Sequence, residues 1–428
     1  MVGANEVAVT ITMIGASGDG IGEASAGKTS GGRVFVPLTV PGDRVMVRLG
    51  PCSGEGRRGQ VVAWLERGPD LAAPSCGHFG RCGGCTLQHL AEPVYQSWKL
   101  GRVTAALERG GLAPLPKHGL ESSGPGGRRR ATFSLMRRGK ALLAGFIERR
   151  GDRLVDLERC PVLAPELLGL LPALRRALLT VLPDGGRADA VVALFEGGID
   201  MLLVGPSRLD LKARQALAGL AVSADLLRLS WQPDARTAPE PVAARRPVLA
   251  WFGGVAVEVP PGAFLQASAE GEAALVALVL AGVGESSCVA DLFAGCGTFS
   301  LPLATGGGRR VHAVEGDGPA MAALARAARG LSGVSTEMRD LARQPLRPEE
   351  LARFGAVVFD PPRAGAAAQA AALAESAVPL VVAVSCNPAT FSRDARLLRN
   401  GGYRLLTVQA VDQFLWSAHV ELVAVFRR

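Results

Sequence analysis

Long apolar runs are absent from this sequence of 428 residues. Its most apolar stretches, such as AGAAAQAAALAESAVPLVVAV, contain Gln and Glu, so no segment reaches the roughly 18 uninterrupted apolar residues of a membrane-spanning helix. The first residues, MVGANEVAVTITMIG, lack the basic start, apolar core and small-residue cleavage site of a signal peptide. We therefore expect a cytoplasmic protein that does not bind a membrane.

The sequence also lacks the pattern of a disulfide-stapled secreted protein. In a long chain without a secretion signal, clustered cysteines point to metal binding or catalysis. Cys76, Cys82 and Cys85 lie together in CGHFGRCGGC, and Cys160 lies apart in ERCPVL. Four thiolates suit zinc or an iron–sulfur cluster, and the glycine-rich loop with one distant cysteine before a proline favours a [4Fe-4S] cluster. Four unliganded thiols are the alternative. Cys52, Cys288 and Cys296 show no such arrangement, and we expect them to be structural.

Acidic residues are in the minority, with 39 Asp and Glu against 47 Lys and Arg, which gives a net charge of +8 and a pI near 9.4. This excess favours a polyanionic partner, although an arginine-rich composition explains it equally well. Position is more informative, because Arg128, Arg129 and Arg130 directly precede the strand-like run ATFSLMRRGK. We expect an RNA-binding surface here, with a solvated charged face as the alternative, and no obligate protein partner. The same region also contains Arg137, Arg138, Lys140, Arg149, Arg150 and Arg153.

Three regions of different pattern follow one another along the chain. Residues 1–66 hold short alternating runs (EVAVTITMI, RVFVPLTV, DRVMVRL, GQVVAWLE) between Gly and Pro turns, which predicts a small β-barrel. Residues 67–255 mix a cysteine-rich loop with helical and strand-like runs, and indicate an α+β domain. In residues 256–428 apolar strands alternate with Ala-rich helices. That alternation predicts an α/β domain whose doubly wound, mainly parallel sheet binds ligands at the carboxyl ends of its strands.

A nucleotide-type site is predicted in the last region. DLFAGCGTFS places Gly295 and Gly297 in the turn after an apolar strand, where missing side chains let a ligand approach the backbone. Glu315 ends the next strand, where a carboxylate can bind ribose hydroxyls, and Asp340 would close a third strand near the adenine amino group. NAD is the rival ligand, but its GxGxxG pattern needs a third glycine where Ser300 stands, which favours S-adenosylmethionine.

A covalent nucleophile is predicted at another strand end, where LVVAVSCNPATFSRDA delivers Cys386 to the carboxyl edge of the sheet. Uracil C5 is a poor nucleophile toward a sulfonium methyl group, and thiolate addition at C6 would activate it. The C5 proton must then leave, and Glu421 in HVELVAVF is the candidate base. A buried structural cysteine and an edge-strand surface glutamate are the alternatives. Phe264 is a candidate for stacking on an exposed base, and Gln266 is a candidate contact of the cofactor.

Together these motifs resemble the RNA uracil-5-methyltransferase family, especially members with an N-terminal TRAM domain and an iron–sulfur cluster that modify 23S ribosomal RNA. The resemblance covers nearly the whole chain. GDGIG with VFVPLTVPGDRV is similar to TRAM, an oligonucleotide-binding-type barrel. The cysteine motifs are similar to cluster ligands, and SCNPATFSRD with HVE to the catalytic motifs. The resemblance implies a Rossmann-like C-terminal domain with Cys386 as nucleophile and Glu421 as base. The cofactor contacts it implies are Gln266, Phe293, Thr298, Glu315 and Asp360.

The sequence departs from this family pattern in places. Thr298 and Ser268 stand where relatives often carry Asn, and QFLWSAHVE replaces a more typical FPxTxHVE. These changes leave the catalytic residues in place but weaken the assignment of the substrate, which is 23S rRNA or, as the alternative, tRNA. A cytosine-5-methyltransferase would bring a second cysteine after a proline, and an amino-group methyltransferase would not need Cys386. A catalytically inactive RNA-binding iron–sulfur protein is the alternative from another class.

Overall fold

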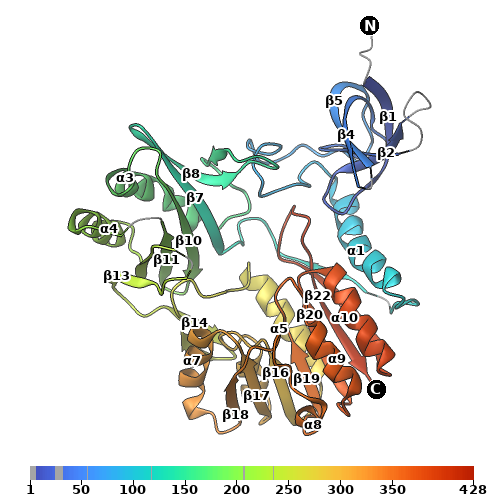
Figure 1. Ribbon diagram of the computed structural model, residues 1–428, viewed down its shortest axis with the longest axis vertical. Helices are drawn as coiled ribbons and strands as arrows, with labels where there is room; N and C mark the ends of the chain where they lie inside the picture. Colours follow the sequence, from blue (N-terminus) through green and yellow to red (C-terminus); the bar gives the residue numbers. More distant parts are fainter. Residues whose placement is uncertain (1–5, 25–31, 55, 117, 206–207, 235) are drawn as a thin grey trace.

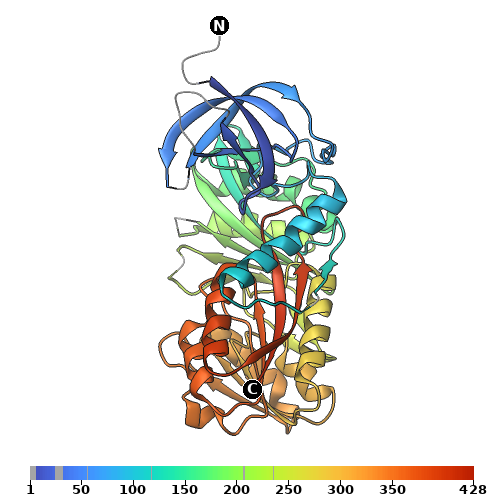
Figure 2. The same ribbon diagram turned by 90° about the vertical axis from the view of Figure 1, so that its right-hand side faces the viewer.

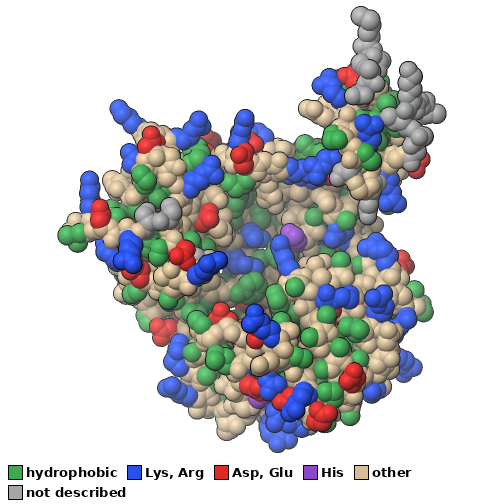
Figure 3. All heavy atoms as spheres, in the orientation of Figure 1, with side chains coloured by type: hydrophobic (Ala, Val, Ile, Leu, Met, Phe, Trp, Pro, Cys, Tyr) green, Lys and Arg blue, Asp and Glu red, His purple; other side chains and the backbone are tan. Residues whose placement is uncertain are grey.

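Figure 1 shows the computed structural model of the protein, which describes residues 6–24, 32–54, 56–116, 118–205, 208–234 and 236–428. Within these residues the strands form a closed barrel, a middle sheet, a small hairpin and a C-terminal sheet. The barrel stands at one end of the molecule, and the middle and C-terminal sheets face each other beside it. The space-filling view is hollowed where these parts meet, and several Lys and Arg side chains line the hollow (Figure 3).

The barrel pairs its strands in the order β1-β2-β3-β5-β4 and closes between β1 and β4. Alternating residues fill it, as Val9, Ile11 and Val47 show by their burial. The predicted run RVFVPLTV forms a strand only as far as Val36, because Pro37 cannot donate to a ladder. The strands are β1 (Glu6–Ile14), β2 (Gly20–Ala24), β3 (Arg33–Val36), β4 (Arg44–Ser53) and β5 (Gly56–Glu66).

The middle sheet has the strand order β13-β12-β11-β10-β7-β8-β9 and is mostly antiparallel. Leu171, Leu174 and Leu178 recur at helical spacing and bury one face of a helix against this sheet. Its strands are β7 (Arg130–Arg138), β8 (Ala141–Ile147), β9 (Leu154–Asp156), β10 (Arg187–Phe195), β11 (Gly198–Val204), β12 (Arg228–Gln232) and β13 (Glu240–Ala244), and its helices are α2 (Pro165–Gly169), α3 (Leu171–Val181) and α4 (Leu211–Ser223).

The C-terminal sheet has the strand order β18-β17-β16-β19-β20-β22-β21-β6. The strands from β18 to β20 run parallel, and β22 is inserted antiparallel between β20 and β21. The prediction of a doubly wound, mainly parallel sheet is confirmed. Its strands are β6 (Leu120–Ser122), β16 (Cys288–Leu292), β17 (Arg310–Glu315), β18 (Val334–Met338), β19 (Ala356–Phe359), β20 (Leu380–Ser385), β21 (Arg404–Asp412) and β22 (Glu421–Arg427).

Helices cover both faces of the C-terminal sheet. Buried side chains of α1, α8, α9 and α10 share one apolar cluster with the sheet, and those of α5 and α6 share another with the opposite strand residues. The helix α7 packs beside α6 and the hairpin. The elements are α1 (Glu92–Arg109), α5 (Ala269–Val283), α6 (Ser300–Thr305), α7 (Gly318–Ala327), the 3-10 helix η1 (Ala328–Gly330), α8 (Pro348–Leu351), α9 (Ala367–Glu375) and α10 (Pro388–Asn400).

Some elements cross the predicted region boundaries. Within the range 67–255, α1 packs on α10 and β6 pairs in parallel with β21 (Figure 2). The strand is therefore part of the C-terminal sheet, and the helix is one of those that cover it. The boundary at 255/256 falls inside the hairpin of β14 (Leu249–Phe252) and β15 (Val255–Glu258), which packs against the C-terminal region. A short parallel edge strand and a helix that precedes its own domain carry no local signal of where they pack.

Candidate active site

One cavity of about 1770 Å³ opens between the middle sheet and the C-terminal sheet, and the segment that follows the barrel also lines it. The predicted catalytic residues, metal ligands and cofactor contacts line it, except Gly297 of the glycine turn. Their roles stay predictions, while their placement in one cavity is a structural finding. The cavity lining includes Cys386 and Glu421, the candidate cofactor contacts Gln266, Phe293, Gly295, Thr298, Glu315, Asp340 and Asp360, and the thiols of Cys76, Cys82, Cys85 and Cys160.

The glycine turn after β16 has the backbone that a close ligand requires. Gly295 and Gly297 have φ angles of +55° and +102°, and a side chain on Gly297 would lie 2.6 Å from a methyl group of Leu324. Phe293 also has a positive φ, +62°, a conformation that costs free energy and is concentrated at functional sites. The carboxylate of Glu315 accepts the Gly295 N–H at 2.9 Å, so it lies beside the turn.

Two buried carboxyl groups lie near this turn. Asp291 accepts a hydrogen bond from the Ser300 hydroxyl at 2.5 Å, which gives the residue at the expected third-glycine position a structural task. Burial raises the pKa of Asp291 to about 7, with the charges of Asp360 and Glu315 adding to the shift. Burial likewise raises the pKa of Asp360, after β19, to about 7. Burial therefore favours the protonated form of both carboxyl groups.

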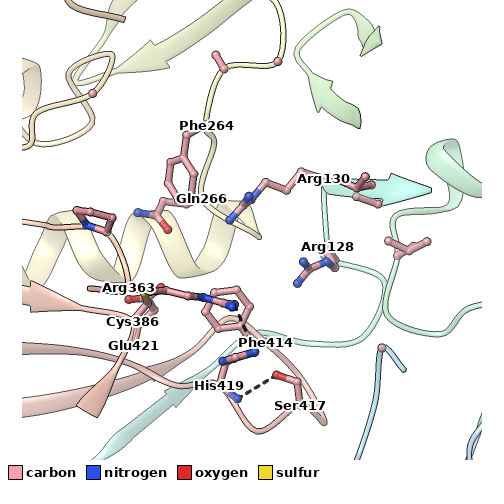
Figure 4. Close-up of a pocket in the computed structure, with 18 of the residues that line it drawn as sticks. Arg128, Arg130, Phe264, Gln266, Arg363, Cys386, Phe414, Ser417, His419 and Glu421 are labelled. Atoms are coloured by element: carbon pink, nitrogen blue, oxygen red, sulfur yellow. Dashed lines mark hydrogen bonds between the residues drawn. The ribbon is translucent and has the colours of Figure 1, made fainter. Parts of the chain in front are cut away.

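Strand pairing brings the predicted nucleophile and base together. Ser385 at the end of β20 pairs with Leu422 of β22, so the next pair along these antiparallel strands is Cys386 opposite Glu421. Figure 4 shows both side chains together at one wall of the cavity, with Arg363 beside them. Two residues far apart in sequence thus meet through adjacent strands.

Burial dominates the electrostatics of this pair. Burial, together with the charges of Glu421 and Asp360, raises the pKa of the Cys386 thiol to about 11 against the opposing effect of Arg363. Burial and the charge of Asp360 raise the pKa of Glu421 to about 8, while a hydrogen bond from Gln413 and the charges of Arg130 and Arg363 act in the opposite direction. Three acidic groups therefore share one poorly solvated pocket.

Aromatic and cationic side chains stand above this wall. Phe264 is 63% exposed, and the guanidinium of Arg130 lies 4.3 Å from its ring centroid. Arg128 lies 5.8 Å from the ring of Phe414. Both arginines line the cavity, as Figure 4 shows. His419, two residues before Glu421, lies 3.3 Å from the Arg363 guanidinium.

The predicted basic surface is only partly available to a ligand. Arg129 pairs with Glu272 at 2.6 Å, and Arg137 donates to the carbonyl groups of Leu179 and Leu182 at the C-terminal end of α3. Arg149 and Arg150 both pair with Asp19 of the barrel, although they also line the cavity. The run of arginines therefore divides into structural and cavity-facing members, which neither their number nor their spacing in the sequence distinguishes.

The four clustered cysteines lie at the other end of the cavity. The thiols are close enough to influence one another, because the charges of Cys160 and Cys76 contribute to the raised pKa of Cys82, after burial as the main cause. In the described part of the chain, no set of three or more His, Cys, Asp or Glu side chains is arranged as metal ligands. The predicted [4Fe-4S] cluster is not established by this geometry.

Gln413 is a site residue that sequence analysis missed. Its side-chain nitrogen donates to Gln266 Oε1 at 2.8 Å and to Glu421 Oε1 at 3.2 Å, and its side-chain oxygen accepts the Ala267 N–H at 2.7 Å. The only signal in the sequence is its place in VDQFLWSAHVE, eight residues before Glu421. A residue that contacts two site residues across strands has no recognisable spacing of its own.

Comparisons with known proteins agree with this geometry. Residues 326–428 match the family model described as tRNA (Uracil-5-)-methyltransferase. The chain is 43% identical over 427 residues to an uncharacterized RNA methyltransferase of Brucella suis, with 98% of this chain and 97% of that protein covered. It is 32% identical over 446 residues to the 23S rRNA (uracil(1939)-C(5))-methyltransferase RlmD of Chromohalobacter salexigens, with 98% and 89% covered.

Among solved structures, the tRNA (uracil-54, C5)-methyltransferase of Pyrococcus abyssi, in complex with S-adenosyl-L-homocysteine, has the same fold. The TM-score is 0.74 at 22% identity, with 99% of this chain and all of that chain covered. The full-length relatives and the family model, which spans both Cys386 and Glu421, show that the chain belongs to the S-adenosylmethionine-dependent RNA uracil-5-methyltransferase family.

Proposed function

We propose that the protein methylates C5 of a uridine in 23S ribosomal RNA, with Cys386 as the nucleophile and Glu421 as the general base. One observation carries the mechanism: the pairing of β20 with β22 sets these two side chains side by side in the cavity that also contains the glycine turn. The 23S rRNA assignment is supported by the relative of that specificity, which is similar over nearly the whole chain. A tRNA uridine is the alternative substrate.

The chemistry needs only these two residues and the methyl donor. S-adenosylmethionine supplies an electrophilic methyl group when bound. The thiolate of Cys386 forms a bond to C6, and the electron pair of the C5–C6 double bond makes C5 nucleophilic. C5 takes the methyl group as the donor's carbon–sulfur bond breaks. Glu421 then removes the C5 proton, and the released pair restores the double bond and expels the thiolate.

The charge of the pocket suits a cationic methyl donor. Asp360, Cys386 and Glu421 all have pKa values raised by burial, so an anionic ligand beside them would oppose their ionisation further. A sulfonium group has the opposite effect, because a nearby positive charge lowers the pKa of acidic groups. The residues present therefore fit S-adenosylmethionine better than a dinucleotide.

We assign RNA recognition to the part of the cavity wall formed by Phe264, Arg128 and Arg130 (Figure 4). A uracil stacked in a helix cannot reach a buried thiol, so the target base must be unpaired or turned outward. Phe264 offers an exposed ring for stacking, already paired with Arg130, and Arg128 adds a second cavity-facing cation. An RNA substrate also agrees with a cytoplasmic location, and no helix in the described ranges is long and apolar enough to cross a membrane.

A [4Fe-4S] cluster held by Cys76, Cys82, Cys85 and Cys160 is part of the proposal. It is supported by the four half-buried thiols, which all line the same cavity. In this position the cluster would stabilise the loop between the barrel and the middle sheet. No step of the methylation is assigned to it.

The test incubates anaerobically purified protein with labelled S-adenosylmethionine and either unmodified 23S rRNA or unmodified tRNA. The RNA is digested to nucleosides, and about four irons per chain are expected in the purified protein. We expect 5-methyluridine in 23S rRNA with the wild type and none with Cys386→Ala. Label in tRNA alone would replace the substrate assignment, and full activity of Cys386→Ala would reject the covalent mechanism.

A further inference from the structure

The side chain of Gln413 has its donor and acceptor atoms fixed by its neighbours. The Ala267 N–H can only donate, so the Gln413 atom facing it must be the oxygen. The Gln413 nitrogen must then face both Gln266 and Glu421, and its two hydrogens serve the two acceptor oxygens there. The oxygen of this buried amide thus accepts one hydrogen bond and its nitrogen donates two, and the flipped amide would not satisfy the three partners.

This arrangement also fixes the amide of Gln266. Because its Oε1 accepts from Gln413, its nitrogen is the atom left for a ligand in the cavity, which Gln266 lines. Gln413 therefore controls two site residues at once: the position of the Glu421 carboxylate and the donor that Gln266 presents. The close packing of Gln413 on the first turn of α5 limits its movement, since a side chain at Gly271 would lie 2.6 Å from Gln413 Cβ.

The residue before Gln413 is held by a fully buried ion pair. Lys99 of α1 and Asp412 have no exposed side-chain surface, and Lys99 Nζ donates to Asp412 Oδ1 at 2.7 Å. The other two Lys99 donors go to the carbonyl oxygens of Phe414, at 3.3 Å, and His419. All three hydrogens of one lysine thus bind the segment 412–419, at both of its ends.

Tyr95, one helical turn before Lys99, completes the clamp. Its hydroxyl donates to Asp412 Oδ2 and accepts the Trp416 N–H at 2.8 Å, while Asp412 Oδ1 also accepts the Phe414 N–H at 3.1 Å. The segment between β21 and β22 is therefore fixed from α1 at its start, middle and end. This segment leads directly into Glu421.

We propose that Gln413 is a positioning residue of the methylation reaction, held by the Lys99–Asp412–Tyr95 clamp, and that it aims the Glu421 carboxylate at the C5 proton. The inference rests on the function proposed above. On this proposal α1, which lies outside the catalytic strands, controls the last step of the reaction. In that step the proton is removed and the thiolate is released. Methyl transfer itself precedes that step.

Besides Gln413, several charged or titratable groups face Glu421 and affect its pKa. Asp360 follows β19, Cys386 follows β20, Arg130 begins β7 and Arg363 lies after Asp360. A change at Gln413 leaves all four in place and removes one hydrogen bond that favours the charged carboxylate. The rate of product release should then rise with pH at higher pH values than in the wild type.

The experiment compares Gln413→Leu with Gln409→Leu. Gln409 lies on β21, four residues before Gln413, and its side-chain oxygen accepts the Gly119 N–H at 3.0 Å. It is therefore a nearby amide that also binds a backbone N–H of another segment. With 23S rRNA and S-adenosylmethionine, we expect Gln413→Leu to release product roughly tenfold to hundredfold more slowly and to accumulate a covalent protein–RNA adduct that carries the methyl label. Gln409→Leu should match the wild type. Tyr95→Phe should show a smaller effect in the same direction.

RNA containing 5-fluorouridine separates the possible failures, because no C5 proton can be removed from it. Wild type and Gln413→Leu should form the fluorinated adduct in equal yield. If the wild type forms none, the proposed function fails and the inference fails with it. If both form it and Gln413→Leu releases 5-methyluridine as fast as the wild type, only the positioning role is rejected. Equal loss of both steps in Gln413→Leu would show a general folding defect and would also reject the role.

Discussion

Buried carboxyl groups are the most informative individual residues of this molecule. Asp291 is fully buried, and one of its oxygens has a hydrogen bond from Ser300 while the other has no partner within the described residues. A protonated carboxyl tolerates this environment better than a carboxylate, because burial without compensation penalises charge. The residue sits at the end of β16, directly before the glycine turn, so its protonation state bears on the stability of the cofactor side of the cavity.

Asp291 should make the folded protein less stable as the pH rises. Its pKa is about 7 in the folded state against 3.8 for an aspartate in water, so its contribution is fully present below about pH 4 and is lost as the pH rises through about 7. The full difference is on the order of 4 kcal/mol. We expect the Tm of Asp291→Asn to fall less than that of the wild type between pH 5 and pH 8, measured by thermal unfolding at matched ionic strength. Parallel curves would show that Asp291 does not titrate in this range.

At the scale of elements, α1 links three parts of the chain. Besides the clamp on the segment 412–419, its Trp98 indole donates to the Ile14 carbonyl of the barrel at 3.2 Å. Its C-terminal end meets α10, where the Ser392 hydroxyl donates to Ala106 O at 2.6 Å. The approach depends on Gly110, because a side chain there would lie 2.2 Å from the Ser392 hydroxyl.

A matched pair of glycine substitutions tests this contact between helices. Gly110→Ala should destabilise the protein by about 1–3 kcal/mol, since neither helix can move apart without breaking the Ser392 bond. Gly101→Ala, in the same helix with no atom within 4 Å of the added carbon, should stabilise it by about 0.5–1 kcal/mol. Urea unfolding measures both. Equal effects of the two substitutions would contradict close packing at Gly110.

The C-terminal strands could be predicted because each was an apolar run ending at a turn or at a chemically distinctive residue. RVHAVE and LVVAVS became β17 and β20 with little change at their ends. The parallel edge strand β6, only Leu120–Ser122, could not be predicted, because its place depends on pairing with β21 some 290 residues later. Local pattern reports which segments are strands, while order in the sheet depends on contacts distant in sequence.

At the scale of the whole molecule, the same distinction applies to the site. Cys386 and Glu421 were predicted as site residues because reactive residue types stood at strand ends, and their adjacency required the antiparallel insertion of β22 beside β20. Gln413, Lys99 and Asp412 escaped notice because ordinary polar residues acquire a role only through the neighbours that folding supplies. The arginines were located as a group, but the pairing of Arg149 with Asp19 of the barrel depends on how two separate parts of the chain pack.

The cavity as a whole should release protons when a cationic methyl donor binds. Asp360 and Glu421 have pKa values of about 7 and about 8, so both are partly protonated near pH 7.5. A positive charge nearby lowers the pKa of a carboxyl group and drives its proton into solution. S-adenosylhomocysteine is a matched control, because it differs from S-adenosylmethionine by the methyl group and the positive charge.

Calorimetric titration at pH 7.5 in two buffers of different ionisation enthalpy measures the number of protons released. We expect a larger release with S-adenosylmethionine than with S-adenosylhomocysteine, and a smaller difference between the two ligands at pH 9, where both carboxyl groups are already ionised. Equal release at pH 7.5 would mean that the sulfonium charge is bound away from Asp360 and Glu421. The acidic character of this pocket would then have to be neutralised by RNA-side cations such as Arg130 and Arg363, which already oppose the raised pKa of Glu421.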